Sequence, residues 1–296
     1  VWQTMPDEDG AYDLQSLSLV PLMVELGIEL DQFEEEERGG LLSRDSVGNN
    51  VLQNLSSMTS DLDSKKDDEE YCELLENSIL DIMKQLREKK HFKKDDIRGH
   101  GLLNCVCCNK TKFFPEKLFR FLLDWDPTAL TARYNLSKFE NGSWLPIHYS
   151  TNSAGIQGFL SVFEEGLLNY PEKLGFVFHE GQENDGRIRE IAYQEACKKY
   201  GVDLVTREIL YRIVKCPVTN TDTFLLSVAA DKEFHLDSLY LLLQKDPAAI
   251  LRFLGGGSNN ESNCDTFTTG RKTGERKRWN PVGNVRNEGN AHSIVY

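Results

Sequence analysis

A segment that ends an apolar helix occurs twice in this chain of 296 residues. Residues 122–130 (LLDWDPTAL) return as residues 242–250 (LLQKDPAAI), and residues 167–174 (LLNYPEKL) form a weaker third copy. Pro127 and Pro247 lack the N–H group that a continuing helix needs, so each predicts a helix end. The aspartate before each proline can accept a hydrogen bond from the turn that follows. A repeated stop of this kind predicts a fold built from similar helical units.

The residues outside these stops show the apolar spacing of amphipathic helices. Positions i, i+3, i+4 and i+7 are apolar in several stretches of residues 14–254, and we expect these stripes to face the core. The alternation of apolar and polar residues that is typical of strands is hard to find, so the predicted fold class is all-α. The stripes are Leu19, Leu22, Met23 and Leu26; Leu75, Ile79, Ile82, Met83 and Leu86; Ile156, Phe159, Leu160 and Phe163; and Leu236, Leu239, Tyr240 and Leu243.

One helix start carries a more specific motif. Residues 145–150 (LPIHYS) follow residues 141–144 (NGSW), which places Gly142, Pro146 and His148 in a fixed order. This order resembles the ankyrin signature Gly-x-Thr-Pro-Leu-His-x-Ala, which opens the first helix of a helix-turn-helix repeat. The copies start near residues 50, 101, 145, 191 and 223, at spacings of 51, 44, 46 and 32 residues. Because ankyrin units run about 33 residues, the resemblance is to a divergent, long-repeat branch of algal type. A HEAT-type or irregular α-solenoid is the competing fold.

The resemblance implies a solenoid of about five to six irregular repeats over residues 14–254, with structural roles for several residues. Pro146 fits the first turn of a helix, where its missing N–H does no harm. Gly48, Gly142 and Gly186 lie near positions where the family's turn needs a positive φ. In the family, the histidine matched here by His148 hydrogen-bonds backbone and ties neighbouring units together. Its place is taken in the other copies by Gln53, Asn104, Gln194 and Leu226.

Two stretches depart from the repeat pattern. Residues 57–70 contain an acidic insert, which we expect to form a loop. Residues 255–296 are rich in Gly and Asn and offer little apolar surface to bury, so they are predicted to be a disordered basic tail. The tail holds six basic and four acidic residues, a net charge of +2. The sequence begins at Val1 and not at Met, so we leave open whether further residues precede it.

Composition narrows the class of protein further. The net charge of −13 becomes −15 without the tail, which disfavours nucleic-acid binding by the body and favours a basic protein partner. No run of about 18 apolar residues is present, so no transmembrane helix is predicted. The seven cysteines are scattered and odd in number. This usage suits a reducing compartment, so we expect a cytoplasmic or nuclear protein.

Candidates for chemistry are few. Cys105 and Cys108 form a C-x-x-C, but a structural zinc site needs four ligands and no second pair follows. We therefore interpret both as structural cysteines. His148 is expected to brace a turn and not to act as a base, and neither a P-loop nor a G-x-S-x-G motif is present. The sequence predicts no cofactor, no metal and no enzymatic activity.

The predicted function is a protein–protein interaction scaffold that binds through loops and first-helix faces. The polar connection over residues 131–143 supplies the candidate partner contacts Arg133, Tyr134, Lys138 and Phe139, because cations and aromatic rings serve as interface anchors. Ordinary loop residues that fold back on the body are the alternative interpretation of this connection. Two other functions stay open. One is a nuclear adaptor addressed by the basic tail, which would also be the only route to nucleic acid, and the other is an enzyme whose site is assembled from dispersed residues.

Overall fold

The computed structural model describes residues 14–60, 69–108, 112–136, 142–151, 155–179, 181–183, 188–189 and 191–216. All of these belong to the first of two compact units, Val1–Gly256, and the second is Gly257–Tyr296. Several predictions fall outside the described residues. These are the repeat start at 223, the stripe of Leu236, Leu239, Tyr240 and Leu243, the tail 255–296, most of the acidic insert (61–68), and residues Lys138, Phe139, Gly186, Leu226 and Pro247.

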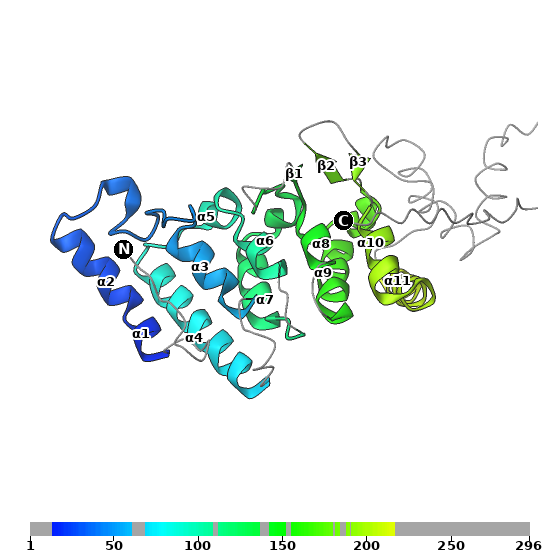
Figure 1. Cartoon of the computed structure of the whole chain (residues 1–296), viewed down its shortest axis with the longest axis horizontal. Coiled ribbons are helices and arrows are strands. Elements are labelled where there is room, and N and C mark those ends of the chain that lie inside the picture. Colours follow the sequence, from blue (N-terminus) through cyan, green and yellow to red (C-terminus); the bar gives the residue numbers. More distant parts are fainter. Residues whose placement is uncertain are drawn as a thin grey trace, which may run out of the picture. The chain divides into compact units, whose positions relative to one another are not determined.

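The described part of the chain is helical, which confirms the predicted all-α class at this level (Figure 1). The α-helices are α1 (Leu14–Ser18), α2 (Val20–Glu29), α3 (Val51–Ser57), α4 (Glu69–Glu88), α5 (Lys94–Gly99), α6 (Leu102–Cys107), α7 (Glu116–Trp125), α8 (Pro146–Ser150), α9 (Ile156–Asn169), α10 (Ala192–Tyr200) and α11 (Val202–Lys215). Short 3-10 helices are η1 (Glu35–Glu37), η2 (Met58–Ser60), η4 (Pro127–Thr131) and η5 (Pro171–Phe176).

The helices lie in two rows. The short helices α3, α6 and α8 contact one another in succession, and Figure 1 shows them following each other in this order. In the second row α4 packs against α7 and α9 against α11, while the Arg120 guanidinium of α7 lies 2.5 Å from the Glu165 carboxylate of α9. Within pairs, α6 packs on α7, α8 on α9 and α10 on α11. Each helix pair therefore buries its apolar faces against the next pair.

The helices α3, α6, α8 and α10 begin at Val51, Leu102, Pro146 and Ala192, each one residue after a start named from the sequence. Pro146 is the first residue of α8, as the motif implied. The helix stop at Pro127 also has a clear geometry. Helix α7 ends at Trp125, and the Asp126 carboxylate accepts hydrogen bonds from the Thr128 backbone N–H at 3.2 Å and hydroxyl at 2.6 Å.

A small antiparallel sheet of strands β1 (Gly142–Ser143), β2 (Gly181–Glu183) and β3 (Ile188–Arg189) accompanies the helices, in the order β1-β2-β3. Gly142 lies opposite Glu183 in this sheet, so it is a strand residue and not the tight-turn residue that the motif suggested. Gly48, by contrast, has φ = 93° in a turn whose N–H groups bond to the Asp45 carboxylate. The left-handed backbone at Gly48 favours glycine.

Two of the predicted stripes are buried, and one is not. The α4 stripe, from Leu75 to Leu86, is in the core, as are Phe159, Leu160 and Phe163 of α9. The stripe on α2 is wrong, because Leu19, Leu22, Met23 and Leu26 are exposed. Helix α2 and the end of α1 instead bury the opposite side, which consists of Leu17, Val20, Pro21, Val24 and Gly27. Both helices contact α4, and Gly27 lies against the Gly39 backbone.

Candidate binding surface

Residues at the histidine slot of the motif form hydrogen bonds that cross from one helix pair to the next. Gln53 is buried in α3, where Asn50 and Gln53 form a reciprocal capping box at the helix start. The Gln53 side-chain amide donates to the His100 carbonyl oxygen at 3.0 Å, directly before the N-cap residue of α6. This bond satisfies a backbone acceptor that α6 itself cannot satisfy.

The next two helix pairs repeat the arrangement. The buried Asn104 amide of α6 donates to the Trp144 carbonyl oxygen at 2.9 Å, directly before the N-cap of α8. His148 Nε2 lies 3.1 Å from the His179 carbonyl oxygen, and since a carbonyl can only accept, the ring nitrogen donates. His179 precedes the β2–β3 hairpin that leads to α10. We call these contacts of Gln53, Asn104 and His148 the inter-pair links.

The candidate contact loop lies close to these links. Tyr134 is half-buried, forms a pair of backbone hydrogen bonds with Trp144, and accepts a hydrogen bond from the Gln53 amide on its hydroxyl oxygen at 3.0 Å. Its carbonyl accepts from the Tyr149 hydroxyl at 2.9 Å. Tyr134 therefore connects α3, Trp144 and α8 within the fold. This agrees with the alternative interpretation, in which the loop residues fold back on the body. Arg133 is half-buried as well.

The short helices offer less surface than the sequence implied. Every residue of α6 and of α8 is buried. Segment 132–136 contributes to this cover, since the Leu136 backbone N–H donates to the Tyr149 hydroxyl at 3.1 Å. In these two pairs the first-helix side chains face the interior, so a partner would meet the loops around them.

The cysteines of the C-x-x-C segment are part of the core. Cys105 and Cys107 are buried on α6 while Cys108 is half-buried. Burial, with a smaller contribution from neighbouring thiols, raises the pKa of Cys105 and of Cys107 well above the ordinary value. Both thiols are therefore protonated, whereas a metal ligand or nucleophile is a thiolate. In the residues that the structure describes, no group of three or more His, Cys, Asp or Glu side chains could hold a metal ion.

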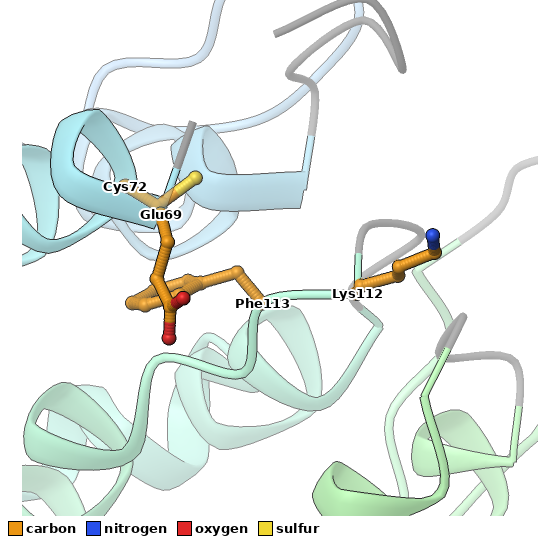
Figure 2. Close-up of a pocket in the computed structure, with 4 residues that line it drawn as sticks. All are labelled: Glu69, Cys72, Lys112 and Phe113. Atoms are coloured by element: carbon orange, nitrogen blue, oxygen red, sulfur yellow. The ribbon is translucent and has the colours of Figure 1, made fainter. Parts of the chain in front are cut away.

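A pocket of about 300 Å³ lies where the start of α4 meets the segment before α7 (Figure 2). Its described lining is Glu69, Cys72, Lys112 and Phe113. Figure 2 shows the Glu69 side chain beside the Phe113 ring, while Lys112 points away from the other three residues. Cys72 is buried and Glu69 is exposed. The described lining therefore offers a carboxylate, an ammonium group, a buried thiol and an aromatic ring.

The exposed apolar side chains of the described surface gather on α2. Leu19, Leu22, Met23, Leu26 and Leu30 follow helical spacing, and we call these five residues the α2 face. The relative solvent exposure of these five residues is between 38% and 63%. The helical spacing in the sequence identifies four of these five residues as one stripe. The spacing predicts that this stripe faces the core, whereas the structure exposes it. The signal that could have corrected the assignment is the second apolar stripe, Leu17, Val20 and Val24, since a helix that is apolar on two sides has two surfaces to cover.

Acidic residues adjoin one end of the α2 face. Glu29 and Asp31 are exposed at the C-terminal end of α2, and Glu34, Glu35 and Glu36 follow them in the chain. Glu25, beside the face, pairs with Lys89 of α4 at 2.6 Å. The helix C-terminus adds its own partial negative charge. The potential at this end is therefore negative.

No helix among the described residues has both the length and the apolar character that crossing a bilayer demands. Comparisons of the chain with protein-family models, with curated proteins and with solved structures gave no match.

Proposed function

We propose that this chain is a protein–protein interaction scaffold built as an ankyrin-like helix-turn-helix solenoid. The observation that carries the proposal is the series of inter-pair links. Gln53, Asn104 and His148 occupy the same place in successive short helices, and each donates to a backbone carbonyl of the next unit. A bond that recurs at one position of each unit is typical of a repeat array, in which each unit contacts its neighbours.

A repeat array binds through its surface, because its apolar faces are used up between units. With α6 and α8 buried, the surface proposed for binding consists of the polar connection predicted over residues 131–143, of the other loops, and of the exposed faces of the second row of helices. The charge of −15 outside the tail favours a basic protein partner, whose association slows as salt is added. The scattered cysteines agree with a cytoplasmic or nuclear setting.

Two thiols of the C-x-x-C segment are poorly suited to catalysis. Cys105 and Cys107 are the most closely spaced cysteines of the chain, together with Cys108. Because burial raises the pKa of both thiols, they stay protonated and unreactive at neutral pH. His148, the remaining candidate for acid–base chemistry, donates its Nε2 proton to a backbone carbonyl inside the fold.

The test is to isolate partners on the immobilised chain from source cells and then to measure the binding of each purified partner by calorimetry. Lys138→Ala with Phe139→Ala should weaken binding at least tenfold. The matched control, Lys84→Ala with Leu74→Ala on exposed positions of α4, should leave the affinity unchanged. If no purified protein binds the chain directly, the scaffold proposal is wrong. If both pairs of substitutions act alike, the loop is not the contact surface.

A further inference from the structure

Helix α2 has two apolar sides, and the structure covers one of them. Leu17, Val20 and Val24 are buried toward α4, whereas the α2 face is open to solvent. Exposed apolar side chains are ordinary when scattered, but five on one helix stripe form a contiguous patch of the kind that marks an interaction site. Helix α2 therefore has one apolar surface that packs inside the fold and a second that is available to another molecule.

The position of α2 in the fold indicates what would contact it. The neighbouring helix α4 is covered on two sides, because it packs against α1 and α2 on one and against α7 on the other (Figure 1). Helix α2 packs mainly against α1 and α4, and its far side carries Leu and Met at positions i, i+3, i+4, i+7 and i+11 counted from Leu19. This spacing is the pattern by which one helix receives another.

The charges at the end of the α2 face select among such helices. Two copies of this chain, each with a net charge of −15 outside the tail, repel each other, and a parallel contact of the two helices would also bring the acidic ends together. A helix with lysine or arginine beside its apolar stripe would be attracted. Lys89 does not reverse this preference, because its ammonium group is already paired with Glu25 at 2.6 Å.

We propose that the α2 face, Leu19, Leu22, Met23, Leu26 and Leu30, docks a basic amphipathic helix of a partner protein. The proposal rests on the scaffold function in that it names a class of partner for it. The site lies on α2 and not in the polar connection predicted over residues 131–143, so either proposed surface can be disproved without the other.

The test measures binding of a labelled synthetic 18-residue peptide to the full chain by fluorescence anisotropy. The peptide has leucines at helical spacing, flanked by lysines. One matched peptide has the same composition with the leucine stripe broken by reordering, and another has glutamate in place of lysine. The chain variant is Leu22→Gln with Leu26→Gln. The control is Leu74→Gln with Leu168→Gln, which removes two equally exposed leucines from α4 and α9. Thermal unfolding verifies that both variants fold.

We expect the lysine peptide to bind the unchanged chain and the control alike. Binding should weaken at least tenfold in Leu22→Gln with Leu26→Gln, and at least tenfold for each matched peptide. Glu29→Lys with Asp31→Lys should weaken it severalfold and reduce its dependence on salt, because fewer charges are then neutralised across the contact.

Four results would overturn the proposal. Equal binding by the α2 variant and the control would mean that the peptide senses only the general acidity of the chain. If the unchanged chain sediments as a dimer and the variant Leu22→Gln with Leu26→Gln sediments as a monomer, a second copy of the chain occupies the α2 face. A tenfold gain in affinity on removing residues 1–12 would mean that the chain's own segment competes for the face. If cellular partners bind the α2 variant with unchanged affinity, the α2 face is not their binding site, although the scaffold function is still supported.

Discussion

At the scale of single residues, Gly101 shows how closely the inter-pair links are packed. It is the N-cap of α6 with φ = 60°, and a Cβ placed on it would collide with the ring and Cβ of Tyr134. The left-handed backbone favours glycine here, and the approach of the Tyr134 ring requires that the side chain be absent. The ring in turn carries the hydroxyl that accepts the Gln53 amide hydrogen bond.

Gly101→Ala should therefore lower the free energy of unfolding by about 2–5 kcal/mol, the sum of a left-handed backbone cost and an overpacking cost. Gly201→Ala is the control for backbone strain without a collision, because Gly201 has φ = 95° and ψ = 137° but no atom within 4 Å of the place that a Cβ would occupy. It should cost about 1–3 kcal/mol from backbone strain alone. Urea unfolding of both variants measures the difference. Equal losses would show that the Tyr134 ring moves aside freely.

Glu76 is a buried carboxylate that caps the start of a neighbouring helix. Its Oε1 accepts from the backbone N–H groups of Lys117 at 2.7 Å and Leu118 at 3.0 Å, in the first turn of α7. Burial raises the pKa of Glu76 above 4.5, although these hydrogen bonds oppose the shift. The folded state thus holds the proton more tightly than the unfolded chain, and Glu76 contributes less stability as pH rises through its folded pKa.

Glu76→Gln keeps an oxygen acceptor and removes the charge. The stability of the unchanged chain relative to this variant should therefore fall as pH rises from below 4.5 through the raised folded pKa of Glu76, since the charged form is the one that burial penalises. Asp45→Asn is the opposite control. Burial raises the pKa of Asp45, but hydrogen bonds from the Asn54 side chain and from the backbone of residues 47–49 together lower it by more, so the net shift is downward. The stability that Asp45 contributes is therefore lost as pH falls through its folded pKa. Parallel pH profiles for both variants would contradict these assignments.

At the scale of elements, helix stops and buried stripes follow from local patterns, and the choice between two stripes does not. The end of α7 before Pro127 could be predicted from the missing N–H group of proline. The buried stripe from Leu75 to Leu86 could be predicted from its helical period. For α2 the apolar residues occupy two faces, and local sequence contains no information on which face α4 covers. The same limit applies to the links. Polar residues that bond backbone were predicted at Gln53 and Asn104, but their acceptors lie 47 and 40 residues away.

The stop after α7 can be tested directly. Asp126→Ala removes the acceptor of the Thr128 N–H and hydroxyl and should lower the free energy of unfolding by about 0.5–2 kcal/mol, the usual effect of losing an N-cap. Asp124→Ala, two residues earlier on an exposed position of α7, should change it by less than about 0.5 kcal/mol. Equilibrium urea unfolding gives both values. A loss at Asp124 as large as that at Asp126 would assign the effect to charge and not to capping.

At the scale of the described unit, the links determine how a local loss of stability spreads. Helix pairs that contact mainly their neighbours have stabilities that add as unit and interface terms, so a defect at one boundary weakens the adjoining pairs most. The Asn104 amide crosses the boundary between the α6–α7 and α8–α9 pairs. Without it the Trp144 carbonyl oxygen, which also accepts from the Tyr134 backbone N–H, loses a side-chain donor within a buried region.

Asn104→Ala should lower the free energy of unfolding by about 0.5–1.5 kcal/mol, because one buried hydrogen bond is lost while the Trp144 carbonyl oxygen keeps the Tyr134 N–H as a donor. In hydrogen exchange, the amides of α6 and α8 should exchange faster while those of α11 retain most of their protection. Gln32→Ala is the control, since the exposed Gln32 amide bonds to the nearby Leu30 carbonyl and crosses no boundary between pairs, and it should alter neither quantity measurably. Uniformly faster exchange from α1 to α11 would instead describe one cooperative block, and a stack of neighbour-coupled helix pairs would then be the wrong physical description of the array.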